Sequence, residues 1–267
     1  MTQSRHYLFE ENPVQRSSKF MLLGLFWFLL LLMPLFLYLG HIQLFPLIDL
    51  KGSTAQFLYW ITCTGSIPEG LIFIVAMLAV CYFLMPRKLF IHLFLAVALS
   101  QSAGVVLKHE LKNHFMEPRP NVQWFDYFHK MDKNFFYGQS KENRQAMMKD
   151  VIRLNAKIMP LSDRIAKHWQ KEVNFSFPSG HTQFAVSFCL VMGFYLLSAG
   201  IVTLPFGLFV WAMVMGFSRM MLGLHWSQDV LASGFMGGIL AIISVWLVQK
   251  LAPKVMKYFP AIYRNQI

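Results

Sequence analysis

Six apolar runs, each close to the length needed to cross a bilayer, constrain this chain more than any other feature. A membrane-spanning helix needs about 20 mainly apolar residues. Such runs cover residues 20–39, 67–84, 89–107, 182–197, 201–221 and 230–248. Only 14% of the residues are charged, whereas an ordinary soluble domain carries about 25%. We therefore expect an all-α polytopic membrane protein, a six-transmembrane-helix bundle formed by a single domain, 1–267.

The first run is too long for a signal peptide, and no small-residue cleavage site follows it. We expect it to be a retained membrane anchor.

The positions of Lys and Arg predict how the bundle is oriented. The two terminal tails and the loop at 85–88 carry nine of these residues, and the short loops on the opposite side carry two. The remaining thirteen lie in the long polar stretch 108–178, but loops of more than about 60 residues translocate largely regardless of their charge. We therefore expect both termini in the cytoplasm and the long loop outside.

The long loop is expected to be partly helical. Met147, Val151, Leu154 and Ile158 recur at helical spacing, and basic residues fill much of the sequence between them. This pattern is typical of an amphipathic helix with a basic face. Such a helix fits either the surface of the outer leaflet or packing against the bundle.

Charge and cysteine content narrow the classes of partner. A formal charge of +11 accompanies no nucleic-acid recognition motif, so basic loops beside anionic lipid headgroups explain it better than nucleic-acid binding does. Cys63, Cys81 and Cys189 are odd in number and lack the spacing of metal ligands. We expect buried thiols, with no disulfide framework, metal or cofactor, and the sequence indicates no obligate protein partner.

Gly234 and Gly238 in the last run are four residues apart. Two small residues at this spacing allow another helix to approach closely. Packing within the bundle is the favoured interpretation, and dimerisation is the other.

The first stretch with chemical potential is Lys112 followed by Arg119-Pro120. Pro118 and Pro120 end any helix, and a residue before proline favours an extended conformation. A cation on a helix end and a second on a rigid extended segment can converge on one anion. Taken alone, both are also compatible with cations that reach toward the membrane surface.

The second stretch is Pro178-Ser179-Gly180-His181, which opens the fourth run. Pro178 is tolerated just before a helix, and Ser179 suits the N-cap position. Gly180 allows a ligand to approach the backbone. A helix N-terminus presents free N–H groups that bind phosphate, and His181 would lie beside such an anion. A capped helix with an incidental histidine is the plainer alternative.

The third stretch contains Arg219, His225 and Asp229, with the last two at the start of the sixth run. Because they are four residues apart, His225 and Asp229 share one helix face. A carboxylate there accepts one ring N–H, fixes the tautomer and leaves the other nitrogen free as a nucleophile. A purely structural Asp–His pair would have the same spacing.

Alternating the six runs across the membrane places all three stretches on the same outer face. Three cations, two histidines, a carboxylate and a helix N-terminus together predict a phosphate site. A transporter would instead hold its substrate near the membrane midplane.

These stretches resemble the signature of the type 2 phosphatidic acid phosphatase superfamily, K-x6-R-P, then P-S-G-H, then S-R-x5-H-x3-D. The resemblance implies that His225 is the nucleophile, that Asp229 orients it, and that His181 protonates the leaving alcohol. It also implies a phosphate-binding cage of Lys112, Arg119, Ser179, Gly180 and Arg219.

The resemblance further implies a metal-independent lipid phosphatase in the bacterial inner membrane, acting on a lipid phosphate within the bilayer. Its expected reaction is hydrolysis of phosphatidylglycerophosphate through a phosphohistidine, in a site that faces the periplasm. The alternative is an undecaprenyl pyrophosphate phosphatase that recycles the cell-wall lipid carrier. Vanadate-dependent haloperoxidases share the three-part signature but are soluble, which the six runs argue against.

Overall fold

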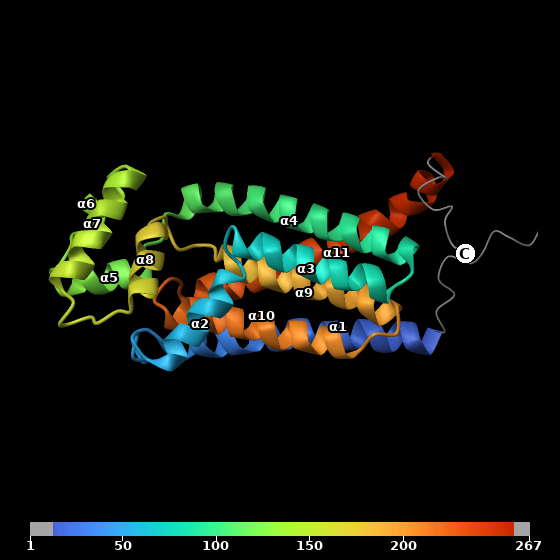
Figure 1. Cartoon of the computed structure of the whole chain (residues 1–267), viewed down its shortest axis with the longest axis horizontal. Coiled ribbons are helices and arrows are strands. Elements are labelled where there is room, and N and C mark those ends of the chain that lie inside the picture. Colours follow the sequence, from blue (N-terminus) through green and yellow to red (C-terminus); the bar gives the residue numbers. More distant parts are fainter. Residues whose placement is uncertain (1–12, 259–267) are drawn as a thin grey trace, which may run out of the picture.

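The computed structural model describes residues 13–258 as a bundle of long helices with a smaller helical unit at one end (Figure 1). The helices are α1 (Pro13–Leu39), α2 (Ser53–Cys63), α3 (Glu69–Leu84), α4 (Arg87–Phe115), α5 (Pro120–Tyr127), α6 (Lys133–Tyr137), α7 (Lys141–Leu154), α8 (Asp163–Lys171), α9 (Gly180–Ser198), α10 (Thr203–Met221) and α11 (Ser227–Tyr258). Within this range there is no strand, so the all-α prediction is confirmed.

Five helices of the described range are long and apolar enough to cross a membrane: α1, α4, α9, α10 and α11. The remaining predicted run, the second one at 67–84, corresponds to α3, which is apolar but only 16 residues long. Its first two predicted residues belong to the turn before the helix. The membrane helix bundle is thus confirmed, although α3 is shorter than a typical span.

Helix α9 forms the centre of the bundle. Its residues are apolar on every side, and fourteen of its nineteen residues are buried, as expected for a helix surrounded by others. It packs against α1, α4, α10 and α11. The outer helices instead expose large apolar side chains such as Phe28, Phe83, Val106 and Trp246, which suits contact with lipid chains.

Gly234 and Gly238 of α11 lie against α1. A β-carbon at Gly238 would fall 2.0 Å from Cε2 of Trp27, and one at Gly234 would fall 3.0 Å from Leu31. The indole N–H of Trp27 also donates to the carbonyl of Gly234 at 3.1 Å. The structure therefore uses the small-residue pair for packing within the chain.

The outer unit, formed by α5 to α8, packs around a second hydrophobic core, to which α2 and the connection between α1 and α2 also contribute. Phe125, Phe136, Met148, Ile165 and Trp169 are fully buried there. The same core includes Leu222 and Leu224 from the connection between α10 and α11, and the indole N–H of Trp169 donates to the carbonyl of Leu222 at 2.9 Å. Because that connection leads to His225, the outer unit helps to hold the loop that carries this histidine.

The amphipathic helix is present as α7, but its predicted apolar face is shifted. Met148, Val151 and Ile152 are buried, whereas Leu154 is 76% exposed. The helix ends at Leu154, so Ile158 lies beyond it. The face turns this way because α7 packs against α8, which favours packing on the protein over lying on the membrane surface. The three cysteines are buried free thiols, as expected.

Candidate active site

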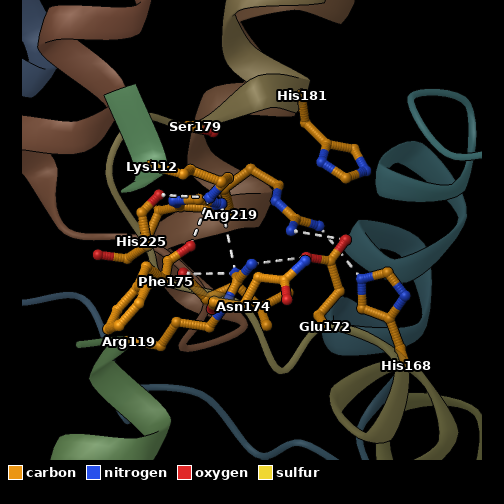
Figure 2. A network of polar contacts seen from close by, with 12 residues as sticks. Lys112, Arg119, His168, Glu172, Asn174, Phe175, Ser179, His181, Arg219 and His225 are labelled. Carbon is orange, nitrogen blue, oxygen red and sulfur yellow. Dashed lines mark hydrogen bonds and ion pairs between the residues drawn. The ribbon is translucent and has the colours of Figure 1, made fainter. Parts of the chain in front are cut away.

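The three motif stretches meet at one end of the bundle, next to the outer unit (Figures 1 and 2). Each contributes the end of a different helix. Lys112 lies in the last turn of α4, Arg119 directly precedes α5, Ser179 precedes α9, and Arg219 lies in the last turn of α10. The structure thus brings together residues that the sequence placed on one face.

Arg119 is held in the extended conformation that its flanking prolines predict, with φ −73° and ψ 151°. The side chain is only 2% exposed. Its Nε donates to the carbonyl of Asn174 at 2.6 Å, and Nη1 donates to the carbonyl of Leu224 at 2.9 Å. Nη2 is left to bind the carboxylate of Glu172 at 2.7 Å. The backbone carbonyls therefore fix the guanidinium so that one edge faces the centre of the site.

Arg219 is completely buried and is fixed through one nitrogen. Its Nη1 donates to Oγ1 of Thr62 at 2.7 Å and to Nε2 of His168 at 3.1 Å. Within the described part of the chain, its Nε and Nη2 have no hydrogen-bond partner, although Nη2 lies 3.5 Å from Oε1 of Glu172. These two nitrogens form the forked edge that binds phosphate oxygens in pairs. In the structure the carboxylate of Glu172 faces this edge.

Glu172 joins the two guanidinium groups. One of its carboxylate oxygens contacts Arg119 and the other faces Arg219. Burial alone would raise the pKa of Glu172, but the charges of the two arginines outweigh burial and hold that pKa well below its usual range. The ionised carboxylate therefore lies where the two arginines stabilise a negative charge.

His225 has the geometry of an oriented nucleophile. Its Nδ1 lies 3.4 Å from Oδ2 of Asp229, and its Nε2 lies 3.4 Å from Nη1 of Arg119. Burial lowers the pKa of His225 well below its usual value, and the nearby cations Arg119, Arg219 and Lys112 lower it further. A neutral imidazole with Nδ1–H toward the carboxylate has its Nε2 lone pair directed into the cage.

The predicted helical position of His225 is wrong in one respect. Helix α11 begins at Ser227, so His225 lies in the turn before it and not on the helix face. The pairing survives because the Asp229 carboxylate also accepts a hydrogen bond from the backbone N–H of Trp226 at 2.9 Å. This hydrogen bond holds the segment that carries His225 close to the first turn of α11.

Lys112 is tied down by the loop that leads to α9. Its ammonium group donates to the carbonyl of Phe175, and to that of Ser176 at 3.2 Å. In Figure 2 it lies beside His225. The loop thus fixes the amino group of Lys112 close to His225.

Ser179 caps α9 as predicted, its hydroxyl accepting a hydrogen bond from the backbone N–H of Thr182 at 3.4 Å. Gly180 is needed for close approach, but to a side chain of this chain: a β-carbon there would fall 2.5 Å from Cδ of Lys108. The sequence predicted a ligand in that space, but the side chain of Lys108 occupies it. The N–H groups of Gly180 and His181, in the first turn, lack intrahelical acceptors.

His181 lies one residue into α9, at the same end of the bundle as His225. In Figure 2, the guanidinium of Arg219 lies between the two imidazole rings. His181 Nε2 is 2.9 Å from Oγ of Ser66, which belongs to the turn between α2 and α3. The second histidine is thus positioned by a part of the chain that the motifs do not include.

Four residues that contact the site were not identified from the sequence: Thr62, Ser66, His168 and Glu172. Thr62 and Ser66 lie in a segment that reads as a plain connection. The sequence gives one signal for Glu172: acidic residues are rare in this part of the chain, and Asp229 is the only one that follows it. Burial and the charge of Arg219 lower the pKa of His168 to about 4, so its imidazole is neutral and accepts the hydrogen bond from that arginine.

A cavity of about 410 Å³ reaches His225 from the side of the connection between α1 and α2. Tyr38, His41, Glu117 and Trp226 are among the residues that line it. Polar side chains thus line an approach to His225, and His181 is not among them.

Comparison with known families agrees with this geometry. Residues 89–253 match the PAP2 superfamily. The chain belongs to this superfamily. The matched segment runs from α4 into α11 and contains the three motif stretches, and the resemblance seen in the sequence is confirmed. The PAP2 chain is therefore a phosphatase built on membrane-spanning helices.

Two curated relatives cover most of this PAP2 chain. It is 31% identical over 198 residues to phosphatidylglycerophosphatase B of Escherichia coli K12, which covers 72% of this chain and 76% of the relative. It is also 31% identical over 242 residues to phosphatidylglycerophosphatase B of Haemophilus influenzae, with 88% and 98% covered. Together with the family, these relatives support a lipid phosphatase.

Proposed function

We propose that this chain, as a single domain, hydrolyses the phosphomonoester of phosphatidylglycerophosphate and related lipid phosphates through a phosphohistidine intermediate. One observation carries the proposal: two buried guanidinium groups converge on a single anion next to His225. In the structure that anion is the Glu172 carboxylate. A phosphoryl group offers more oxygens to the same donors and more charge to neutralise.

In the first half of the reaction, Nε2 of His225 attacks phosphorus as the bond to the lipid oxygen breaks. The electron pair of the broken bond goes to that oxygen, which takes a proton from His181. Asp229 accepts the Nδ1–H of His225 and stabilises the positive charge that develops on the ring. In the second half, His181 takes a proton from water, whose oxygen attacks phosphorus and releases His225.

The cage supplies positioning and charge stabilisation, which are most of what phosphoryl transfer requires. Nε and Nη2 of Arg219, together with Nη2 of Arg119, would bind phosphoryl oxygens once Glu172 has moved aside. Lys112 adds a third cation, and the capped start of α9 at Ser179 and Gly180 adds backbone N–H groups. We expect these fixed charges to replace a metal ion.

The substrate is expected to remain in the bilayer while its headgroup enters the site. The site lies at one end of the spanning helices, where a headgroup would lie while its acyl chains stay between lipid-facing side chains. The Lys and Arg distribution supports an inner-membrane protein with both termini cytoplasmic and the site periplasmic.

The test is phosphate release by the purified chain from phosphatidylglycerophosphate and from undecaprenyl pyrophosphate, side by side, in the presence of EDTA. We expect the phosphatidylglycerophosphate rate to be higher. We expect His225→Ala to abolish release and leave no ³²P trapped on the protein after acid-free quenching. His109→Ala, an exposed histidine on α4, is the matched control. A preference for undecaprenyl pyrophosphate would favour the alternative function, and full activity of His225→Ala would exclude the mechanism.

A further inference from the structure

The turn between α2 and α3 contacts the ring of His181 at two points. Oγ of Ser66 lies 2.9 Å from Nε2 of that histidine. A β-carbon added at the neighbouring Gly65 would fall 2.6 Å from Cδ2 of the same ring. The glycine is therefore needed for the turn to lie flat against the imidazole, and the serine is held at its edge.

The turn is itself anchored to the bundle. The indole N–H of Trp211, on α10, donates to Oγ1 of Thr64 at 2.9 Å, and that hydroxyl donates to the carbonyl of Ile61 at 2.6 Å. The backbone N–H of Ser66 donates to the carbonyl of Cys63 at 2.9 Å. With these bonds, the position of the Ser66 hydroxyl is set by the helices rather than by a free loop.

The contact with Ser66 gives the two ring nitrogens of His181 different surroundings. Nε2 is engaged by Ser66, and Figure 2 shows one ring nitrogen turned toward Arg219 and the other turned away. A hydroxyl can accept a hydrogen bond from Nε2–H in both the neutral and the protonated ring. Nδ1 then faces the cage and is free to exchange its proton.

We propose that Ser66 is a positioning residue for His181, holding Nε2 protonated so that Nδ1 gives and takes the proton during hydrolysis. The proposal rests on the role assigned to His181 above. As the bond from phosphorus to the lipid oxygen breaks and that from phosphorus to His225 forms, the Nδ1 proton passes to the leaving oxygen. When water attacks, its proton returns to Nδ1, and the electron pair between phosphorus and nitrogen returns to His225.

The first test compares leaving groups. A protonating residue matters most for an alkoxide and least for an aryl phosphate, whose leaving group needs little help. A misplaced catalytic group lowers a rate by up to about 100-fold, so we expect Ser66→Ala to lower kcat on phosphatidic acid by 10- to 100-fold. The loss on p-nitrophenyl phosphate should be at least tenfold smaller. Ser66→Thr, which keeps the hydroxyl, should recover most of the lipid rate.

Two further variants separate positioning from folding. Ser102→Ala, an exposed serine on α4, should leave both rates unchanged. In a His181→Ala background, Ser66→Ala should cause no additional loss, because its effect passes through that ring. Equal losses on both substrates, or an additive loss in the double variant, would overturn the proposal.

A measurement without substrate keeps this inference separate from the proposed reaction. ¹⁵N spectra of the imidazoles, with His181 assigned through His181→Ala, should show the Nε2–H tautomer in the wild type and its loss in Ser66→Ala. The Nδ1–H tautomer in the wild type, or an unchanged spectrum in Ser66→Ala, would refute the positioning role. Failure of the wild type to hydrolyse any lipid phosphate would refute the proposed function instead.

Discussion

At the scale of single residues, the carboxylate of Glu172 competes for the place that a phosphoryl group would take. It binds Arg119 at 2.7 Å and faces Arg219 at 3.5 Å, and both arginines hold it ionised. Any phosphate that enters must displace it. The sequence predicted the arginines through their motifs but not this carboxylate, because a contact 47 residues from Arg219 along the chain leaves no local pattern.

We expect Glu172→Gln to bind inorganic phosphate about tenfold more tightly, which corresponds to about 1.4 kcal/mol. The neutral amide would be displaced from the guanidinium groups more easily than the carboxylate. The measurement is the inhibition constant for phosphate, with Glu142→Gln, an exposed carboxylate on α7, as control. Weaker phosphate binding would instead show that Glu172 serves to hold the arginines in place.

The protonation state of His225 gives a second prediction at this scale. Burial lowers the pKa of this residue and nearby cations lower it further, and only the neutral ring can attack phosphorus. Activity should therefore fall on the acid side at a pH below the ordinary histidine value of about 6.5. Loss of the His181 proton should produce a basic limb and a bell-shaped profile of kcat/KM.

Replacing a nearby cation should move the acid limb. Lys112→Gln removes one positive charge that lowers the pKa of His225, so the acid limb should move to higher pH. Lys133→Gln in the outer unit should leave it in place. An acid limb that is unmoved in Lys112→Gln, or one that moves equally in both variants, would contradict the electrostatic account.

At the scale of helices, the apolar runs predicted the spans because a helix that crosses a bilayer must be both long enough and apolar enough. The segments that connect the spans were harder to predict from the sequence. Helix α2 carries Thr62 in a segment read as a loop, and α7 turns a different face inward than its spacing predicted. Which face of a helix is buried depends on the neighbouring element, here α8, and the sequence of a single helix does not specify that neighbour.

The contact between α1 and α11 gives the prediction at this scale. Gly238→Ala places a methyl group against the indole of Trp27, and overpacking of this kind costs about 1–3 kcal/mol. We expect a lower Tm in detergent, partly restored by Trp27→Phe. Gly207→Ala on α10, where nothing lies within 4 Å, should leave Tm unchanged or raise it. Equal effects of the two glycine substitutions would show that this packing contributes little.

At the scale of the whole molecule, the fold separates the site from the start of α1 and the end of α11, as far as the structure describes them. The described start of α1 and end of α11 lie at one end of the bundle, and the motif stretches lie at the other (Figure 1). The spans, the three motifs and this shared face could be predicted from the sequence. The packed outer unit could not, because its core forms between short helices whose apolar residues are few and distant in sequence.

This separation makes the orientation testable with single cysteines. Because Cys63, Cys81 and Cys189 are buried, they should react slowly and leave a low background. Asn143→Cys, on the exposed face of α7, should react with a membrane-impermeant maleimide in spheroplasts. Arg87→Cys, exposed at the start of α4, should react only after the membrane is opened.

The opposite labelling pattern would place the site in the cytoplasm without changing the fold. The charges of the short loops would then have failed to set the orientation, and the thirteen basic residues of the long loop would be the physical reason. Long loops, however, cross the membrane largely regardless of their charge. The basic residues of this loop belong to a unit that packs around a buried core shared with α2 and the connection between α10 and α11, so we expect them to behave as part of a folded domain and not as a short charged loop.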